Sequence, residues 1–169
     1  MRLHSVGIAA VVVGCAASRV CADVEISIGY LRQEIDRPPV LSNLDPMPED
    51  LGIAGARLAI EDSQTTGGFL GHIYQLEVVS VPPEGDIAGA AKDLLGRSDL
   101  ILLDGPTAGL LSVVDGAANR NALFVNVSSG DPYIRGEGCR RSLLHTVPEQ
   151  SAETDALMQL LAIRQWARA

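Results

Sequence analysis

Short apolar runs alternate along this chain with segments in which apolar residues recur every three or four positions. The short runs, bounded by turn residues, predict strands, which cover residues 24–30, 74–81, 100–103, 123–127 and 143–147. The segments between them predict helices that begin near Pro48, Asp86, Pro106 and Ser151, because these residue types favour a helix N-terminus. Between the fourth and fifth strands the pattern predicts a long polar loop that contains Cys139.

This alternation predicts an α/β fold: an open parallel sheet of about five strands with helices on both faces. A crossover between parallel strands needs a helix-length connection, which the spacing supplies. The order of the strands is not encoded in the pattern, and we expect the flavodoxin-like order 2-1-3-4-5. Residues 100–103 are all apolar, which predicts a strand that is covered on both faces.

The pattern also predicts how the helices pack and end. Leu51, Ala54 and Leu58 predict the buried stripe of the first helix, which we expect to end at residues 65–68. Its small residues predict a close approach to the sheet: Gly52, Gly55, Ala56 and Ala59. Gly96 is expected to cap the second helix. The last helix is expected to carry one apolar face, made of Ala156, Leu157, Leu160 and Leu161.

The first 22 residues predict a secretory signal peptide. Arg2 precedes an apolar stretch over residues 6–17, and the sequence ending at Ala22 suits signal peptidase. The apolar stretch is shorter than the roughly 20 residues that span a bilayer. We therefore expect a periplasmic domain made of residues 23–169. The alternative is a lipobox ending at Cys15, which would leave the protein anchored to a membrane by a lipid.

Charge and cysteine content narrow the possible partners. Loss of Arg2 and Arg19 with the signal changes the formal net charge from −8 to −10. We expect a domain this acidic to bind nucleic acid and anionic lipid poorly, because both require a basic protein surface. Only Cys139 remains after cleavage. It is either buried and inert or lacks a partner within this chain.

In an open parallel sheet, ligands bind beyond the carboxyl ends of the strands. Four segments rich in hydroxyl, amide and turn residues lie there: residues 30–43, 104–107, 128–133 and 145–148. From them we select the candidate ligand-binding residues: Tyr30, Arg32, Asn43, Gly105, Pro106, Thr107, Ser128, Ser129 and His145.

Catalytic interpretations have weaker support. Ser128, Asp131 and His145 supply the residue types of a hydrolase triad, but the chain lacks a Gly-x-Ser-x-Gly nucleophile elbow. It also lacks a glycine-rich phosphate loop after the first strand. His72 and His145 have no ligand-spaced partners. We therefore expect a binding protein that is not an enzyme and carries neither a metal nor a cofactor.

Three features together are informative: the first strand directly after the predicted signal peptide (residues 24–30), the Gly105-Pro106-Thr107 turn after the third strand, and Ser128-Ser129 after the fourth. In these features the chain resembles the type I periplasmic solute-binding proteins of the leucine/isoleucine/valine-binding kind. Residues 29–34, 37–46, 138–141 and 144–148 are similar to a branch of that family associated with PQQ-dependent alcohol dehydrogenases.

The resemblance implies a small-molecule solute and, as partners, the membrane subunits of an ABC transporter or another periplasmic protein. It implies that Gly105, Pro106, Thr107, Ser128 and Ser129 hold the polar part of the solute. The quinone cofactor and an alcohol-derived metabolite are the candidate solutes. The family has two lobes, and this chain stops near Trp166, where the second would begin; the resemblance therefore implies the N-terminal lobe alone, truncated. A sensor or partner-docking domain on the same fold is the alternative, and a hydrolase is a third class.

Overall fold

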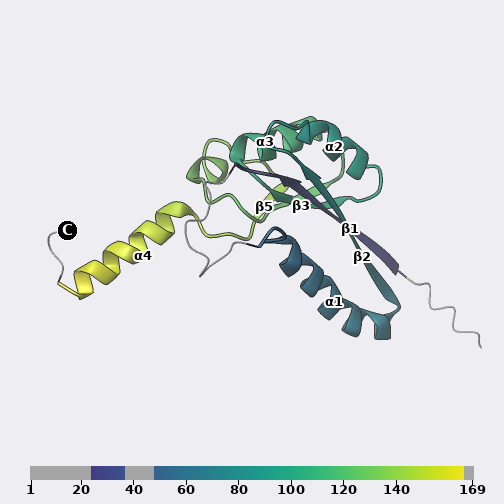
Figure 1. The fold of residues 1–169 in the computed structure, drawn as a ribbon, viewed down its shortest axis with the longest axis horizontal. Coiled ribbons are helices and arrows are strands. Elements are labelled where there is room, and N and C mark those ends of the chain that lie inside the picture. Colours follow the sequence, from purple (N-terminus) through teal and green to yellow (C-terminus); the bar gives the residue numbers. More distant parts are fainter. Residues whose placement is uncertain (1–23, 37–47, 166–169) are drawn as a thin grey trace, which may run out of the picture.

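The computed structural model describes residues 24–36 and 48–165. The predicted signal peptide, Cys15, Asn43 and Trp166 lie outside these residues. The described part is an α/β domain, as the alternation of strands and helices predicted (Figure 1).

Five parallel strands form one open sheet. They are β1 (Val24–Gln33), β2 (His72–Val81), β3 (Leu100–Asp104), β4 (Leu123–Asn126) and β5 (Leu143–His145). Their spatial order is β2-β1-β3-β4-β5, which confirms the predicted order 2-1-3-4-5. The carboxyl ends of β1, β3 and β4 therefore meet at one edge of the sheet.

Helices flank the sheet on both faces. They are α1 (Ile53–Leu70), α2 (Ile87–Leu94), α3 (Thr107–Gly116) and α4 (Gln150–Ile163), with a 3-10 helix, η1 (Pro132–Arg135), between β4 and β5. In Figure 1, α2 and α3 lie together on one side of the sheet and α1 lies on the other, beside β2. The last helix, α4, projects away from the body of the domain.

The hydrophobic core lies between the sheet and the α2–α3 pair. Fully buried residues of β1, β3 and β4 meet residues of the two helices there: Leu31, Ile101, Leu103, Phe124, Leu94 and Leu110. Gly29 allows this close approach, since a Cβ at that position would lie 2.7 Å from Cδ2 of Leu94. Leu100 and Leu102 face the other side and are only partly buried, so β3 is covered on that face to a smaller extent than on the α2–α3 face.

Helix α1 differs most from its prediction. It continues through residues 65–68 and ends at Gly71, whose φ of 72° is left-handed. Gln64 donates to the His72 carbonyl and accepts from the Tyr74 backbone N–H, and Gly67 packs against the Tyr74 ring. These contacts with β2 outweigh the weak local preference of a Thr-Thr-Gly-Gly sequence for a helix.

The predicted packing face of α1 is also wrong. Leu58 is 59% exposed, whereas the buried residues of the helix are Ile53 and Gly67. No atom lies within 4 Å of a Cβ built on Gly55, so the predicted close approach to the sheet fails there. It occurs instead at Gly67 and, directly before the helix, at Gly52, where a Cβ would lie 2.5 Å from Tyr30 Oη. The C-terminal half of α1 packs against β2, through Gln64 and Gly67.

Several shorter-range predictions are tested directly. Asp86 caps α2 as predicted, with its carboxylate accepting from the Gly89 backbone N–H at 2.8 Å. The C-cap of this helix is Leu95 and not Gly96. Glu149, and not Ser151, is the N-cap of α4. Cys139 is exposed, which excludes the buried alternative, and it forms no disulfide within the part of the chain described.

Candidate functional site

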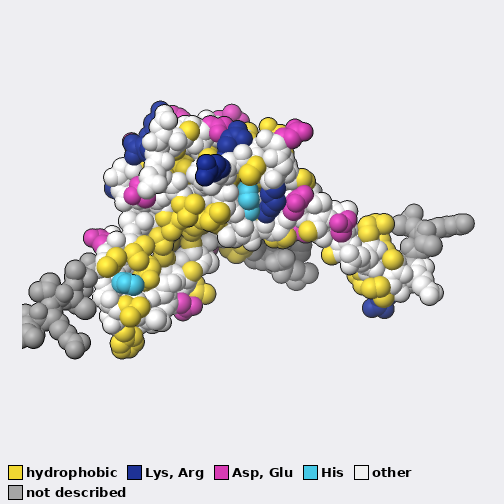
Figure 2. Space-filling view, turned by 180° about the vertical axis from the view of Figure 1, so that it is seen from behind, with side chains coloured by type: hydrophobic (Ala, Val, Ile, Leu, Met, Phe, Trp, Pro, Cys, Tyr) yellow, Lys and Arg dark blue, Asp and Glu magenta, His cyan; other side chains and the backbone are white. Residues whose placement is uncertain are grey.

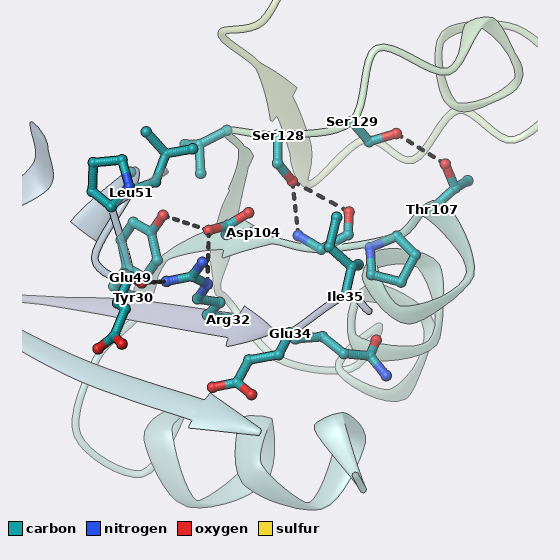
Figure 3. A pocket seen from close by; sticks show the side chains of 16 residues that line it. Tyr30, Arg32, Glu34, Ile35, Glu49, Leu51, Asp104, Thr107, Ser128 and Ser129 are labelled. Atoms are coloured by element: carbon teal, nitrogen blue, oxygen red, sulfur yellow. Dashed lines mark hydrogen bonds and ion pairs between the residues drawn. The ribbon is translucent and has the colours of Figure 1, made fainter. Parts of the chain in front are cut away.

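A cleft of about 1310 Å³ opens beyond the carboxyl ends of β1, β3 and β4 (Figure 3). The segment that leads into α1 forms one wall, and the turn that leads into α3 forms another. From β1 the chain continues to α1 on one face of the sheet, and from β3 it continues to α3 on the other face. The two connections diverge there, and the cleft occupies the resulting topological switch point.

An ion pair and a tyrosine form the floor of the cleft. Arg32 Nε lies 3.7 Å from Asp104 Oδ2, and the Tyr30 hydroxyl donates to the same oxygen at 2.8 Å. Arg32 also donates to the backbone carbonyl of Glu49 at 2.7 Å, which ties the start of α1 to β1. Figure 3 shows Tyr30 and Arg32 directed toward Asp104.

Burial raises the pKa of Tyr30 well above its ordinary value, and the hydrogen bond to Asp104 and the charge of its carboxylate raise it further. The hydroxyl therefore stays a hydrogen-bond donor over the physiological pH range. Gly52 covers this hydroxyl with a φ of 84°, and a Cβ there would lie 2.5 Å from Tyr30 Oη. Glycine at position 52 is thus required by the backbone conformation and by the close contact.

Hydroxyl groups line the opposite wall of the cleft. Ser128 Oγ accepts from the Gly105 backbone N–H at 2.7 Å and donates to the carbonyl of the same residue at 3.2 Å. Thr107 Oγ1 donates to Asp131 Oδ2 at 2.9 Å and lies 2.9 Å from Ser129 Oγ. These bonds hold the turn after β3 against the loop after β4.

Asn126 supports this wall from beneath. The side chain is fully buried, and its Oδ1 accepts from the backbone N–H groups of Ser128 and Ser129 at 3.1 and 2.8 Å. Its Nδ2 donates to the Ser129 carbonyl at 2.6 Å and lies 3.2 Å from His145 Nδ1. One amide therefore fixes the backbone that presents both serine hydroxyls.

Most of the predicted ligand-binding residues meet in this cleft. Seven of them line it: Tyr30, Arg32, Gly105, Pro106, Thr107, Ser128 and Ser129. His145 does not line it; the side chain lies behind the Ser128–Ser129 wall, against Asn126. Asn43 lies outside the described residues.

Burial lowers the pKa of His145 below its ordinary value, and the positive charge of Arg135 lowers it further. Both effects favour the neutral form of the ring over the charged form. Because Asn126 Nδ2 is a donor, His145 Nδ1 acts as the acceptor, which assigns the proton of the neutral ring to Nε2. The ring therefore completes the hydrogen bonding of a buried amide.

The hydrolase residue types occupy separate hydrogen-bond environments. Ser128 pairs with Gly105, Asp131 with Thr107 and the Tyr133 backbone N–H, and His145 with Asn126. Over residues 24–36 and 48–165, no three His, Cys, Asp or Glu residues are grouped so as to hold a metal ion. The helices described there are all too short or too polar to cross a membrane.

Two residues that were not among the predicted ligand-binding residues shape the site. Asp104 accepts hydrogen bonds at the floor, and Asn126 supports the wall. Both carried a usable signal, since each is a polar residue that ends a buried apolar strand. Gly52 was predicted only to allow a close approach to the sheet, and it also covers the floor at the Tyr30 hydroxyl.

The fold and the cleft define an α/β domain with a ligand-sized cavity at the switch point of an open parallel sheet. No family model matches the chain, and neither does any curated protein.

Proposed function

We propose that this protein binds a small organic solute in the cleft, as the periplasmic solute-binding component of an ABC-type transporter. The observation that carries the proposal is the position of the cleft at the switch point of the sheet, lined by groups from three strand ends. Sites of this kind combine apolar walls with a few fixed polar groups. The resemblance of the sequence to type I solute-binding proteins supports the same function.

The lining supports a solute that is part polar and part hydrocarbon. The cleft is lined by the hydroxyls of Thr107, Ser128 and Ser129 and by the exposed apolar side chains of Ile35 and Leu51. These apolar side chains would shield a hydrocarbon portion from water, while the hydroxyls would bond to its polar end. An alcohol-derived metabolite has this character.

Charge supports an uncharged or cationic solute over an anionic one. Among the described residues 24–36 and 48–165, the lining contains three acids, Glu34, Glu49 and Asp104, and one base, Arg32. Arg32 is already paired with Asp104, so Glu34 and Glu49 leave the rim negative. A carboxylate-bearing ligand such as the quinone cofactor would be repelled at such a rim. Of the two candidate solutes, we therefore favour the alcohol-derived metabolite over the quinone cofactor. Either solute would link the protein to PQQ-dependent alcohol oxidation.

The proposed compartment is the periplasm, reached through the signal peptide, with lipid anchorage at Cys15 as the alternative. The proposed partners are the membrane subunits of the transporter. An acidic exported domain is suited to this environment and is poorly suited to nucleic acid, whose phosphates require a basic surface.

Isothermal titration with a panel of alcohols, aldehydes, amines, amino acids and the quinone cofactor tests the proposal. We expect saturable binding of an uncharged or cationic member, weakened about tenfold or more by Thr107→Val or Ser128→Ala. Ser63→Ala is the matched control, because Ser63 is exposed on α1, away from the cleft. Binding that neither cleft variant changes would place the site elsewhere and refute the proposal.

A partner-docking or sensor domain is the second candidate, favoured by the exposed apolar residues of α4. It predicts no saturable solute binding and a stable complex with another protein. Hydrolytic turnover that disappears in Ser128→Ala would contradict both candidates.

A further inference from the structure

Two of the hydroxyl groups on the wall of the cleft form a chain of hydrogen bonds that runs in one direction. Thr107 Oγ1 lies 2.9 Å from Asp131 Oδ2, and a carboxylate only accepts, so the single proton of Thr107 is directed to Asp131. Thr107 Oγ1 also lies 2.9 Å from Ser129 Oγ, and Ser129 is therefore the donor in that pair. Figure 3 shows these two hydroxyls directed toward each other. We call Ser129, Thr107 and Asp131 the hydroxyl relay.

The third hydroxyl of this wall also keeps its proton within the protein. Ser128 Oγ donates to the Gly105 carbonyl at 3.2 Å while it accepts from the N–H of the same residue at 2.7 Å. A hydroxyl has one proton and two lone pairs. Each of the three hydroxyls therefore spends its proton on the protein and retains a lone pair for a solute.

The other side-chain donors of the cleft are bonded within the protein as well. Tyr30 donates to Asp104, and Arg32 donates to a backbone carbonyl and pairs with the same acid. Gln33 Nε2 donates to the Pro83 carbonyl at 2.8 Å. Among the described residues that line the cleft, every side chain that can donate thus has an acceptor on the protein. Three carboxylates add further acceptors: Glu34, Glu49 and Asp104.

The N-terminus of α3 borders the cleft, and such a terminus by itself favours an anion. Asp131 supplies that anion from within the protein. Its carboxylate is bonded to the hydroxyl of Thr107, the first residue of the helix. The positive end of the helix is therefore already offset by a charge of the chain itself.

The charge of the whole protein does not select a head group. The formal net charge is −8, and Figure 2 shows acidic side chains scattered among basic ones over the visible face. Such a distribution attracts cations to the surface in general and defines no site on it. Selection must therefore come from the groups in the cleft.

We propose that the cleft selects a solute whose polar head is a hydrogen-bond donor, an ammonium group before a hydroxyl, and that Asp131 sets this selectivity through the direction of the hydroxyl relay. The inference rests on the proposed solute-binding function and specifies the chemistry of the solute's polar end. An ammonium group offers three donors and a positive charge, whereas a carbonyl or carboxylate head would meet only lone pairs. Asp131 is a positioning residue, because it acts through Thr107 and Ser129 and does not line the cleft.

Replacement of Asp131 by asparagine should reverse the relay. Asp131 Oδ1 accepts from the Tyr133 backbone N–H at 2.9 Å, and only the oxygen of an asparagine amide can keep this bond. The amide nitrogen then faces Thr107 Oγ1 and donates to it. The proton of Thr107 turns to Ser129, and the proton of Ser129 turns into the cleft. The wall thereby changes from an acceptor to a donor with almost no change in shape.

NMR titration of the isotope-labelled protein tests the proposal with four probes that share a hydrocarbon chain: hexylamine, hexanol, hexanone and hexanoate. The backbone amide signals of Gly105, Thr107, Ser128 and Ser129 report binding in the cleft, at probe concentrations up to about 20 mM. For the wild-type protein at neutral pH we expect hexylamine to bind most tightly and hexanol next. Hexanone and hexanoate should bind about tenfold or more weakly than hexylamine.

The same titration of Asp131→Asn separates the relay from simple charge. Hexylamine should weaken about tenfold and hexanone should tighten about tenfold, while hexanol, which can donate or accept, should stay within about threefold. Loss of the negative charge alone would weaken hexylamine without tightening hexanone. Asp62→Asn removes the same charge from an exposed position on α1 outside the cleft lining, and it should leave the order of the probes unchanged.

The possible failures are distinguishable. Hexanone or hexanoate as the tightest ligand of the wild-type cleft would overturn the inference and leave the proposed solute-binding function standing. An absence of saturable shifts with all four probes would contradict both. In Asp131→Asn, a loss of affinity for hexylamine alone, or an equal loss for every probe, would overturn the role of the relay. The dispersion of the amide spectrum establishes that each variant is folded.

Discussion

Replacement of Asn126 by alanine should destabilise the domain by far more than an ordinary asparagine substitution. The side chain is fully buried and takes part in four hydrogen bonds, with two backbone N–H groups, the Ser129 carbonyl and His145 Nδ1. Alanine leaves these partners without the amide, in a space too confined to restore all four bonds with water. The loop that carries Ser128 and Ser129 then loses its support.

The expected size follows from the number of bonds. A typical hydrogen bond contributes about 1 kcal/mol net, and four of them at a buried site give a loss of about 3 to 4 kcal/mol. Such a loss is a large fraction of the 5–15 kcal/mol that holds an ordinary domain folded. With an m-value of about 2 kcal/mol/M, the urea midpoint should fall by about 1.5 to 2 M.

Urea unfolding followed by far-UV circular dichroism measures this loss. Asn121→Ala is the matched control, because Asn121 is exposed and makes no side-chain hydrogen bond with the described residues; its effect should lie within about 0.5 kcal/mol. A loss below about 1 kcal/mol in Asn126→Ala would show that the amide does not hold the loop. An equal loss in both variants would contradict the assignment of the effect to burial.

Two further predictions concern Gly52 and His145. Gly52→Ala should lower the free energy of unfolding by about 1 to 3 kcal/mol, because the φ of 84° is strained for alanine and the new Cβ would meet Tyr30 Oη. Gly55 lies within the helix with no atom near its Cβ position, so Gly55→Ala should raise the free energy of unfolding by about 0.5 to 1 kcal/mol. Urea unfolding of the two variants measures these opposite signs. The pKa of His145 is lowered in the folded state, so stability should be full above the unfolded pKa of about 6.5 and should fall as pH drops below it toward the folded pKa. His145→Gln should flatten that fall, and an unchanged slope in the variant would exclude His145 as its source.

The strands were predictable from the sequence because burial in a parallel sheet imposes a strong pattern, whereas their order was expected from the common order of such folds and not from the pattern. Ile101, Leu103 and Phe124 lie in short apolar runs and are buried in the core. The end of α1 was not predictable, since it depends on Gln64 bonding to a strand that follows the helix. Tertiary contacts of this kind leave no local signal.

The cleft was predictable in outline but not in detail. The rule that strand ends hold ligands brought Tyr30, Thr107 and Ser128 to one place. The rule could not pair Tyr30 with Asp104, because 74 residues separate them and nothing local links their spacing. The apolar residues expected on α4 lie on a helix none of whose residues is buried in the described part of the chain.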